Sequence, residues 1–334
     1  MDYALISLDL AGLSATMRRA MKKTLMLLLS VAPVVMAEDW FNDWVDDASA
    51  LAETVYSDWH HNLPESGFVP SFASFEMTSN MGERHGGSTL GWQKFGLCVP
   101  LADPRKSGGA DWMFNASLNA DVTFMDADGV FDLRKNELYN ITLPVAAIVP
   151  RHNGDTIIAV LAPSLASDFV HSSHSFHLNF LFSYSVKHSE TFSYSVGLGH
   201  SPDATVYGLM PVFSFDWQMT PDWSMRMSGF RWAVMRRMDD HLSLGAFMDG
   251  AGGSWAVNTR YGTRMLRVRS LVLGLTGEYD FSEPGETKRI ATLSIGSTVA
   301  TTARLCRYNR DLDCEEGHHY HPGLFVSGAV DFRF

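Results

Sequence analysis

The sequence lacks three features that would point to other classes of protein. Beyond residue 40 it has no run of ~18 apolar residues, so that part of the chain offers no membrane-spanning helix. It has no surplus of basic residues, because 26 lysines and arginines stand against 37 aspartates and glutamates, and we expect no nucleic-acid partner. It also has no cofactor-binding motif, and we expect no cofactor.

The N-terminus has the pattern of a signal peptide. A basic start at residues 21–23 precedes an apolar stretch over residues 25–36, and Ala37 follows. We expect cleavage after Ala37. An uncleaved anchor is disfavoured because about a dozen apolar residues are too few to span a membrane. The residues before the signal are an upstream extension, and the candidates for the true start are Met1, Met17 and Met21.

Cleavage would make the chain more acidic. Residues 1–37 carry two acidic and four basic residues, so the mature chain has a net charge of −13. This charge fits a surface protein whose loops are kept soluble by negative residues.

From residue 112 onward, apolar side chains recur at every second position. In residues 112–125 the even positions are all apolar and the odd positions are mostly polar. The alternation recurs in residues 176–187, 192–199, 207–219 and 270–281. Because successive side chains of a strand point to opposite faces, each segment has one apolar face and one largely polar face.

A soluble β-sandwich would also alternate, but two features favour a membrane barrel. Sandwich strands have about 5–6 residues in all, whereas the apolar stripes here alone contain up to seven residues. Aromatic residues also gather at stripe ends, where interfacial girdles lie: Trp112, Phe124, Trp217, Tyr279 and Phe281. Such a sheet must close, because an open edge in hydrocarbon leaves backbone groups unpaired.

The last eleven residues, 324–334, place apolar residues at every second position and end in an aromatic ring. This pattern resembles the signal that marks bacterial outer-membrane barrels for their assembly machinery, and Val330, Phe332 and Phe334 carry it. The resemblance implies the assembly machinery, periplasmic chaperones and outer-membrane lipids as partners.

The sequence therefore predicts an all-β fold: a transmembrane antiparallel up-and-down β-barrel of about fourteen strands. An even number places both ends of the barrel in the periplasm, with short turns there and longer loops outside. An extra turn or a bulge near Gly229 is an open alternative, and merging one hairpin would give twelve strands. The expected strands are 68–79, 88–100, 111–125, 138–150, 155–164, 175–187, 190–200, 205–219, 223–237, 241–249, 253–262, 264–281, 287–303 and 321–334.

Between the signal and the barrel, apolar residues recur at helical spacing. Trp40, Trp44, Leu51 and Val55 share one face, which predicts a short acidic amphipathic helix that ends before Pro64. The helix could plug the lumen, cap the periplasmic mouth or form a loosely held tail. The expected domains are residues 1–37 (extension and signal peptide), 38–66 (helix and linker) and 67–334 (barrel).

Residues 209–247 carry a further, looser pattern. Pro211 precedes an aromatic stretch, Pro221 and Trp223 follow it, and a basic strand with a tryptophan ends the segment. The segment is similar to families of outer-membrane barrels that have no assigned function. This resemblance implies the barrel architecture and transfers no site residues.

The last expected outer loop contains cysteines and histidines. Cys306 and Cys314 lie close enough in sequence to predict a disulfide in an oxidising compartment, with Cys98 left as a free thiol. His318, His319 and His321 are of a type that binds zinc, copper or nickel. Because such clusters are common in exposed loops, we expect no metal site.

A second cluster has the residue types of a hydrolase. A barrel enzyme would need its nucleophile and base within hydrogen-bond reach on the wall. This cluster matches no family motif, and enzymatic activity is the least favoured hypothesis. Its members are Asp168, His171, Ser172, Ser173, His174, Ser175 and His177.

The polar faces of the strands predict which residues line the lumen or its rims. Mixed charges there either line a water-filled pore or pair into a closed network. Fourteen strands lie between the ~8 that side chains fill and the ~16 that leave a channel, so both a narrow passage and a closed barrel whose charges satisfy one another stay open. The predicted lining residues are Asn115, Asn119, Asp121, His177, Asp216, Arg226, Arg236, Arg260, Arg269, Glu278 and Asp280.

Three hypotheses follow for the function. The first is a porin-like passive channel for small solutes in the outer membrane. The second is a non-conducting barrel that acts as a structural or surface-interaction protein. The third is an outer-membrane lipid or peptide hydrolase. We prefer the first, because the lumen-facing stripe is the most defensible functional feature of the sequence.

Overall fold

The computed structural model describes residues 70–106, 112–129, 131–151, 154–170, 175–200, 209–229, 231–283, 288–307, 314 and 317–333. The expected signal peptide, the amphipathic helix and Phe334 lie outside the described residues. No helix in the described part of the chain is long and apolar enough to cross a membrane.

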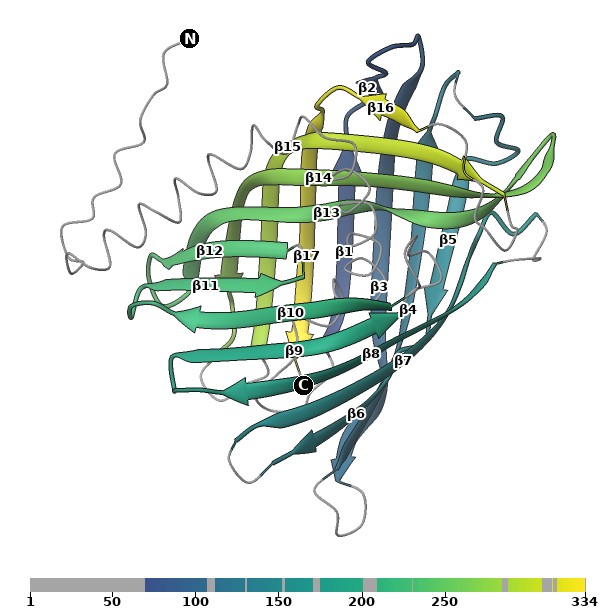
Figure 1. Cartoon of the computed structure of the whole chain (residues 1–334). Helices are drawn as coiled ribbons and strands as arrows, with labels where there is room; N and C mark the ends of the chain where they lie inside the picture. Colours follow the sequence, from purple (N-terminus) through teal and green to yellow (C-terminus); the bar gives the residue numbers. More distant parts are fainter. Residues whose placement is uncertain are drawn as a thin grey trace, which may run out of the picture. The chain divides into compact units, whose positions relative to one another are not determined.

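The described residues form one antiparallel sheet whose strands follow each other in chain order (Figure 1). The strands are β1 (Pro70–Thr78), β2 (Met81–Gly82), β3 (Thr89–Lys106), β4 (Met113–Asp126), β5 (Glu137–Thr142), β6 (Val145–Pro150), β7 (Thr156–Ser167), β8 (Phe176–Lys187), β9 (Phe192–His200), β10 (Leu209–Gln218), β11 (Trp223–Ser228), β12 (Arg231–Arg237), β13 (Leu242–Thr259), β14 (Gly262–Asp280), β15 (Lys288–Cys306), β16 (His318–Tyr320) and β17 (Leu324–Arg333).

The sheet closes into a barrel because β1 pairs with β17, from Pro70 opposite Arg333 to Thr78 opposite Phe325. β5 and β6 act as one interrupted strand, since both pair with β4 and with β7. With that pair counted once and the short β2 and β16 set aside, the barrel has fourteen strands. The predicted fold class is confirmed. We call the end that holds Pro70 and Arg333 the terminal end, and the opposite end the distal end.

Two strand predictions were wrong, and their errors cancel in the count. The segment 223–237 is not one strand, because Gly229 takes a φ of +57° and turns the chain between β11 and β12. The segments 241–249 and 253–262 are not two strands, because residues 250–253 bend the chain without reversing it, and β13 runs unbroken from Leu242 to Thr259.

The outer face of the barrel is apolar on strands all around it. Residues that point outward alternate with buried inward residues, as in β8, where Phe176, Leu178 and Phe182 are exposed and His177 and Asn179 are buried. A soluble protein rarely exposes so much contiguous apolar surface. Other large apolar residues exposed on the outer face include Phe95, Leu97, Phe114, Leu118, Leu161, Leu198, Phe213, Leu275, Leu293, Ile295 and Leu324.

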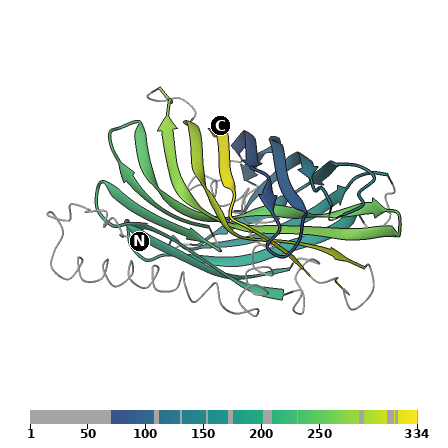
Figure 2. The same ribbon diagram turned by 90° about the horizontal axis from the view of Figure 1, so that it is seen from above.

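At the distal end, strands β13, β14 and β15 continue beyond the wall formed by β8 to β12. They bend over and run toward β5 and β7 (Figures 1 and 2). Ala256 of β13 there pairs in parallel with Ser167 of β7, which bypasses the five strands β8 to β12. The segments of β13, β14, β15, β16, β2, β3, β4, β5 and β7 thus close a second, smaller ring, which we call the narrow section.

The bend has a local cause in each of two adjacent strand pairs. In β13, Gly252 has a φ of +121°, and an added Cβ would lie 2.1 Å from the carbonyl oxygen of Val268. Between β14 and β15, the register shifts by one residue after Leu271, which is a β-bulge. Glycine permits the positive φ and bulges bend strands, so the three strands turn at the same level.

Apolar side chains fill the narrow section. The members that are at most 2% exposed include Met81, Leu90, Trp92, Met125, Leu138, Val257, Leu266, Val268, Val272, Ala303 and Tyr320. A ring of about eight strands has an interior that side chains alone can fill, and this ring of nine segments behaves in the same way. Within the described residues, apolar side chains therefore occupy the interior of the distal end.

Candidate functional site: the barrel lumen

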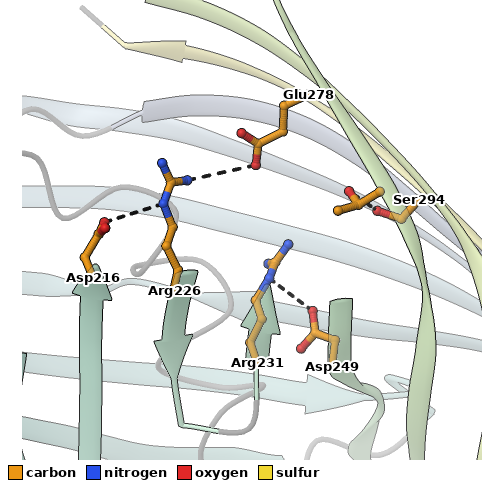
Figure 3. Close-up of polar contacts among 7 residues, drawn as sticks. Asp216, Arg226, Arg231, Asp249, Glu278 and Ser294 are labelled. Carbon is orange, nitrogen blue, oxygen red and sulfur yellow. Dashed lines mark hydrogen bonds and ion pairs between the residues drawn. The ribbon is translucent and has the colours of Figure 1, made fainter. Parts of the chain in front are cut away.

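The mouth of the lumen at the terminal end holds a charged network that water reaches. Arg226 of β11 lies between two carboxylates, with its Nε 3.5 Å from Asp216 and its Nη1 4.0 Å from Glu278 (Figure 3). The side chains of Arg226 and Asp216 are 51% and 58% exposed, whereas that of Glu278 is 23% exposed. These ion pairs are therefore well hydrated, and each contributes little to stability.

Beyond the mouth, a cavity of about 190 Å³ lies inside the barrel below the narrow section. Phe247, Trp255 and Phe325, which belong to the apolar cluster of the narrow section, form part of its lining. The rest of the lining is largely polar. Its charged members are Glu76, Lys94, Asp121, Arg231, Asp249 and Asp331.

Strand register sets the polar side of this cavity. Glu76 of β1 lies opposite Lys94 of β3, and Lys94 lies opposite Thr123 of β4, so the three form one row across the wall. The indole Nε1 of Trp92 donates a hydrogen bond of 2.6 Å to Glu76. In the next row, Asp121 accepts a hydrogen bond of 3.5 Å from the amide of Asn140.

Other charged residues of the cavity lining come from β12 and from the bent strand β13. Asp249, just before the bend of β13, forms an ion pair of 3.4 Å with Arg231 at the start of β12 (Figure 3). Asp249 and Arg231 line the same cavity as Glu76 and Lys94, so β12 and β13 and the strands β1 to β4 all contribute to its wall.

A set of polar contacts, which we call the latch, holds β13 against β7. The carboxylate of Asp168 accepts hydrogen bonds from the backbone N–H and the side-chain amide of Asn258, at 2.7 and 2.9 Å. The backbone N–H of Asp168 donates to the carbonyl of Ala256 at 3.1 Å. Asp168 is 1% exposed, so these charge-assisted bonds are shielded from water.

The predicted lumen residues occupy different levels of the barrel. Asp121 and His177 line the cavity, and Asp216, Arg226 and Glu278 form the mouth network. Asn115 and Asn119 are buried on the inward face of β4. Asp280 lies at the terminal end of β14, where it accepts a hydrogen bond from Ser282, and Arg236 lies over the ring of Trp223.

Two predicted lumen arginines lie at the distal end. Arg260 is in the turn between β13 and β14, exposed, with its Nε 3.0 Å from Asp132. Arg269 is buried in the narrow section and alternates with Val268 of the apolar cluster, so it points away from that cluster. The bend moves this part of β14 out of the wide part of the barrel, and the sequence pattern does not reveal that displacement.

Five charged lining residues were missed by the sequence analysis: Glu76, Lys94, Arg231, Asp249 and Asp331. Glu76 and Lys94 occupy the polar positions of strands that alternate, next to Phe75 and Phe95, and that signal could have identified them. Arg231 lies within the segment 223–237 and Asp249 ends the segment 241–249, and both segments were given wrong strand bounds, which hid the orientation of these residues.

The three histidines take part in a distal seam between the first and last hairpins. The imidazole of His318 lies 2.7 Å from Glu83, the carbonyl of His319 accepts from Arg84, and the backbone N–H of His321 donates to Gly82. Hydrogen bonds from Ser88 and His318 lower the pKa of Glu83, and burial raises the pKa of Tyr320 to about 12. Within the described residues, no group of three potential ligands could hold a metal ion.

The cysteines and the described members of the serine–histidine cluster occupy several places in the barrel, and His177 of the cluster lines the cavity. Cys306 and Cys314 form a disulfide at the distal end of β15, and Cys98 is buried in β3 and is not part of a disulfide. In the second cluster, His171, Ser172, Ser173 and His174 lie outside the described residues. Ser175 is buried, and Asp168 is bound to Asn258 in the latch.

A protein-family model described as "Domain of unknown function (DUF6268)" matches residues 80–304. The chain belongs to this family. The DUF6268 match covers β2 to β14 and nearly all of β15, which include most of the narrow section and of the cavity wall. None of the curated proteins matches the chain.

Several solved structures of outer-membrane proteins are similar to this DUF6268 member at low identity. The COG4313 outer membrane channel from Pseudomonas putida F1 is 9% identical, with 79% of this chain and 95% of that chain covered and a TM-score of 0.40. The Pseudomonas putida toluene transporter TodX is 8% identical, with coverages of 79% and 89% and a TM-score of 0.30. Pseudomonas aeruginosa OpdQ is 10% identical, with coverages of 78% and 99% and a TM-score of 0.28.

Proposed function

We propose that this protein is an outer-membrane barrel that passes small polar solutes and is closed at its distal end in the conformation described. The apolar outer face supports a lipid environment, and the turns at the terminal end would lie in the periplasm, as in other outer-membrane barrels. The observation that carries the proposal is the polar interior, which runs from a hydrated charged mouth into a cavity below the narrow section.

In this proposal, passage requires the narrow section to open. Within the described part of the chain an apolar cluster fills this section, whereas the latch is a small set of hydrogen bonds that could break as a unit. Removing the Asp168 carboxylate would leave the amide and the backbone N–H of Asn258 without their acceptor, at a free-energy cost of about 1–3 kcal/mol per buried group. That loss favours the open state.

Single-channel recording in planar bilayers tests the proposal. We expect rare openings from the wild type and more frequent stepwise openings from Asp168→Ala, because the latch no longer stabilises the closed state. Asp240→Asn is a matched control, since Asp240 is exposed in the turn at the terminal end. Folding is checked by heat-modifiable migration. Silence from both wild type and Asp168→Ala, with folded barrels, would refute conduction.

A second candidate is a non-conducting barrel, and the filled narrow section favours it. Under that alternative, the distal seam and the loops would carry the function through contacts at the cell surface, and Asp168→Ala would reduce stability without producing conductance. The same recordings therefore distinguish the two candidates.

A further inference from the structure

We infer that the cavity is a binding site for a small organic solute that carries a positive charge, such as a primary amine. This inference rests on the proposed function, because it names the class of solute that the lumen would favour. It starts from the charge of the lining, where four carboxylates (Glu76, Asp121, Asp249 and Asp331) stand against two cationic side chains (Lys94 and Arg231).

The carboxylates lie on several sides of the cavity and are not gathered at one point. Glu76 and Asp121 belong to β1 and β4, whereas Asp249 belongs to β13 and lies across the cavity. Within the described residues, no three carboxylates, imidazoles or thiols converge closely enough to hold a metal ion. A spread of carboxylates suits an extended solute with its charge on an organic chain better than a bare metal ion.

A second observation points to a ligand inside the cavity. Thr123 lines it, is 1% exposed, and its hydroxyl has no hydrogen-bond partner within the described part of the chain. Buried hydroxyl groups are nearly always bonded. The row Glu76–Lys94–Thr123 places this hydroxyl on the same wall as the carboxylate of Glu76. Lys94 lies between the two in that row, so an ammonium group in the cavity could donate to the Thr123 hydroxyl while the nearby carboxylates stabilise its charge.

The size of the cavity limits the solute. At about 190 Å³ it is smaller than the ~300–1,000 Å³ of sites for drug-sized ligands, so it suits a solute of few heavy atoms. Aromatic lining residues, among them Phe247, Trp255 and Phe325, would contact the hydrocarbon portion of such a solute. The lining thus matches a short aliphatic chain that ends in an ammonium group.

Isothermal titration of the folded barrel in detergent tests the inference with three four-carbon probes. The probes are 1,4-diaminobutane, 1,4-butanediol and succinate, which are positive, neutral and negative. We expect saturable binding of the diamine only. The double variant Glu76→Gln, Asp121→Asn should weaken this binding at least tenfold, and Thr123→Val should weaken it several-fold, whereas Asp240→Asn should leave it unchanged.

Several outcomes would overturn the inference: equal binding of the neutral or negative probe, unchanged binding in the double variant, or saturable binding of Mg²⁺ without binding of the diamine. Heat-modifiable migration identifies any variant that does not fold, and Thr123→Val, which is nearly isosteric, then serves as the deciding variant. Diamine binding by a barrel that never conducts would support this inference while refuting the proposed function. Conduction without a preference for the diamine over succinate would support the proposed function while refuting this inference.

Discussion

At the scale of the residue, Gly252 directs the course of three strands. Its φ of +121° lies in a region that side chains with a Cβ rarely adopt, and its neighbour across the sheet leaves no room for that atom. A chain without this glycine could continue straight along the wall, and β13 would then not reach β7. The narrow section therefore depends on the backbone conformation of Gly252 together with the β-bulge between β14 and β15.

Substitution of Gly252 by alanine tests this dependence. We expect a loss of about 1–3 kcal/mol or more in folding stability, because the backbone is strained and the Cβ meets the carbonyl of Val268. Gly82→Ala is the matched control, since nothing lies within 4 Å of a Cβ added there. The measurement is the midpoint of the heat-induced mobility shift. Equal midpoints for the two variants would contradict the prediction.

Glu83 makes the distal seam sensitive to acid. Because its pKa is lowered in the folded protein, its stabilising contribution is complete above the unfolded value of about 4.3 and is lost as the pH falls through the folded value. We expect Glu83→Gln to lower the thermal midpoint at pH 7, with a difference from wild type that shrinks below about pH 4. A difference that grows as the pH falls would show that the sign is wrong.

At the scale of the element, alternation predicted most strands because each strand of a membrane barrel has one lipid-facing side. Strands such as β4 and β8 were predicted to within one or two residues. The errors lie around Gly229 and Gly252, where the same residue type forms a turn in one case and a bend in the other. Whether such a glycine forms a turn or a bend depends on pairing with strands that are distant in sequence, and a local sequence pattern does not contain that information.

The same limit applies to the lumen. Residues of the wide part, such as Asp121 and Glu278, were identified because the period of two holds along their strands. Arg269 was assigned to the lumen on the same rule, yet it lies beyond the bulge, where β14 belongs to the narrow section. The inward polar residues of β1 and β3 could have been predicted from the alternation of those strands. The ion pair between Arg231 and Asp249 could not, because it depends on how the strands pair in the fold.

A cross-link between β7 and β13 tests the role of the latch as an element. Ser167 and Ala256 are register partners in adjacent strands, within the Cα separation that disulfides require. In Ser167→Cys, Ala256→Cys we expect oxidation to abolish openings and reduction to restore them. Ser167→Cys alone, treated in the same way, controls for reduction of the Cys306–Cys314 disulfide. Undiminished conductance in the oxidised protein would show that solutes do not pass through the narrow section.

At the scale of the whole molecule, closure depends on β17. This strand pairs with β15 on one side and with β1 on the other, so it joins the first and last parts of the barrel. We expect deletion of residues 324–334 to prevent heat-modifiable folding both in cells and in detergent, because two strand edges would remain unpaired.

We expect a substitution in the proposed assembly signal to have a different effect from the deletion of residues 324–334. Phe334→Ala should reduce the amount of barrel in the outer membrane of cells while leaving refolding in detergent unchanged, because recognition by the assembly machinery is lost and strand pairing is kept. Western blotting of membrane fractions and refolding yields measure the two effects. Equal loss in both assays would assign Phe334 a purely structural role.

Because β13 pairs with β7, the width of the barrel and the closure of its narrow section are set by separate sets of strands. The five strands β8 to β12 contribute to the circumference of the wide part alone, whereas the ring that carries the apolar cluster closes without them. The gain or loss of a hairpin among those five strands would widen or narrow the wide part of the barrel. The apolar cluster of the narrow section would stay intact. The width of the barrel can therefore change while the narrow section keeps the same strands.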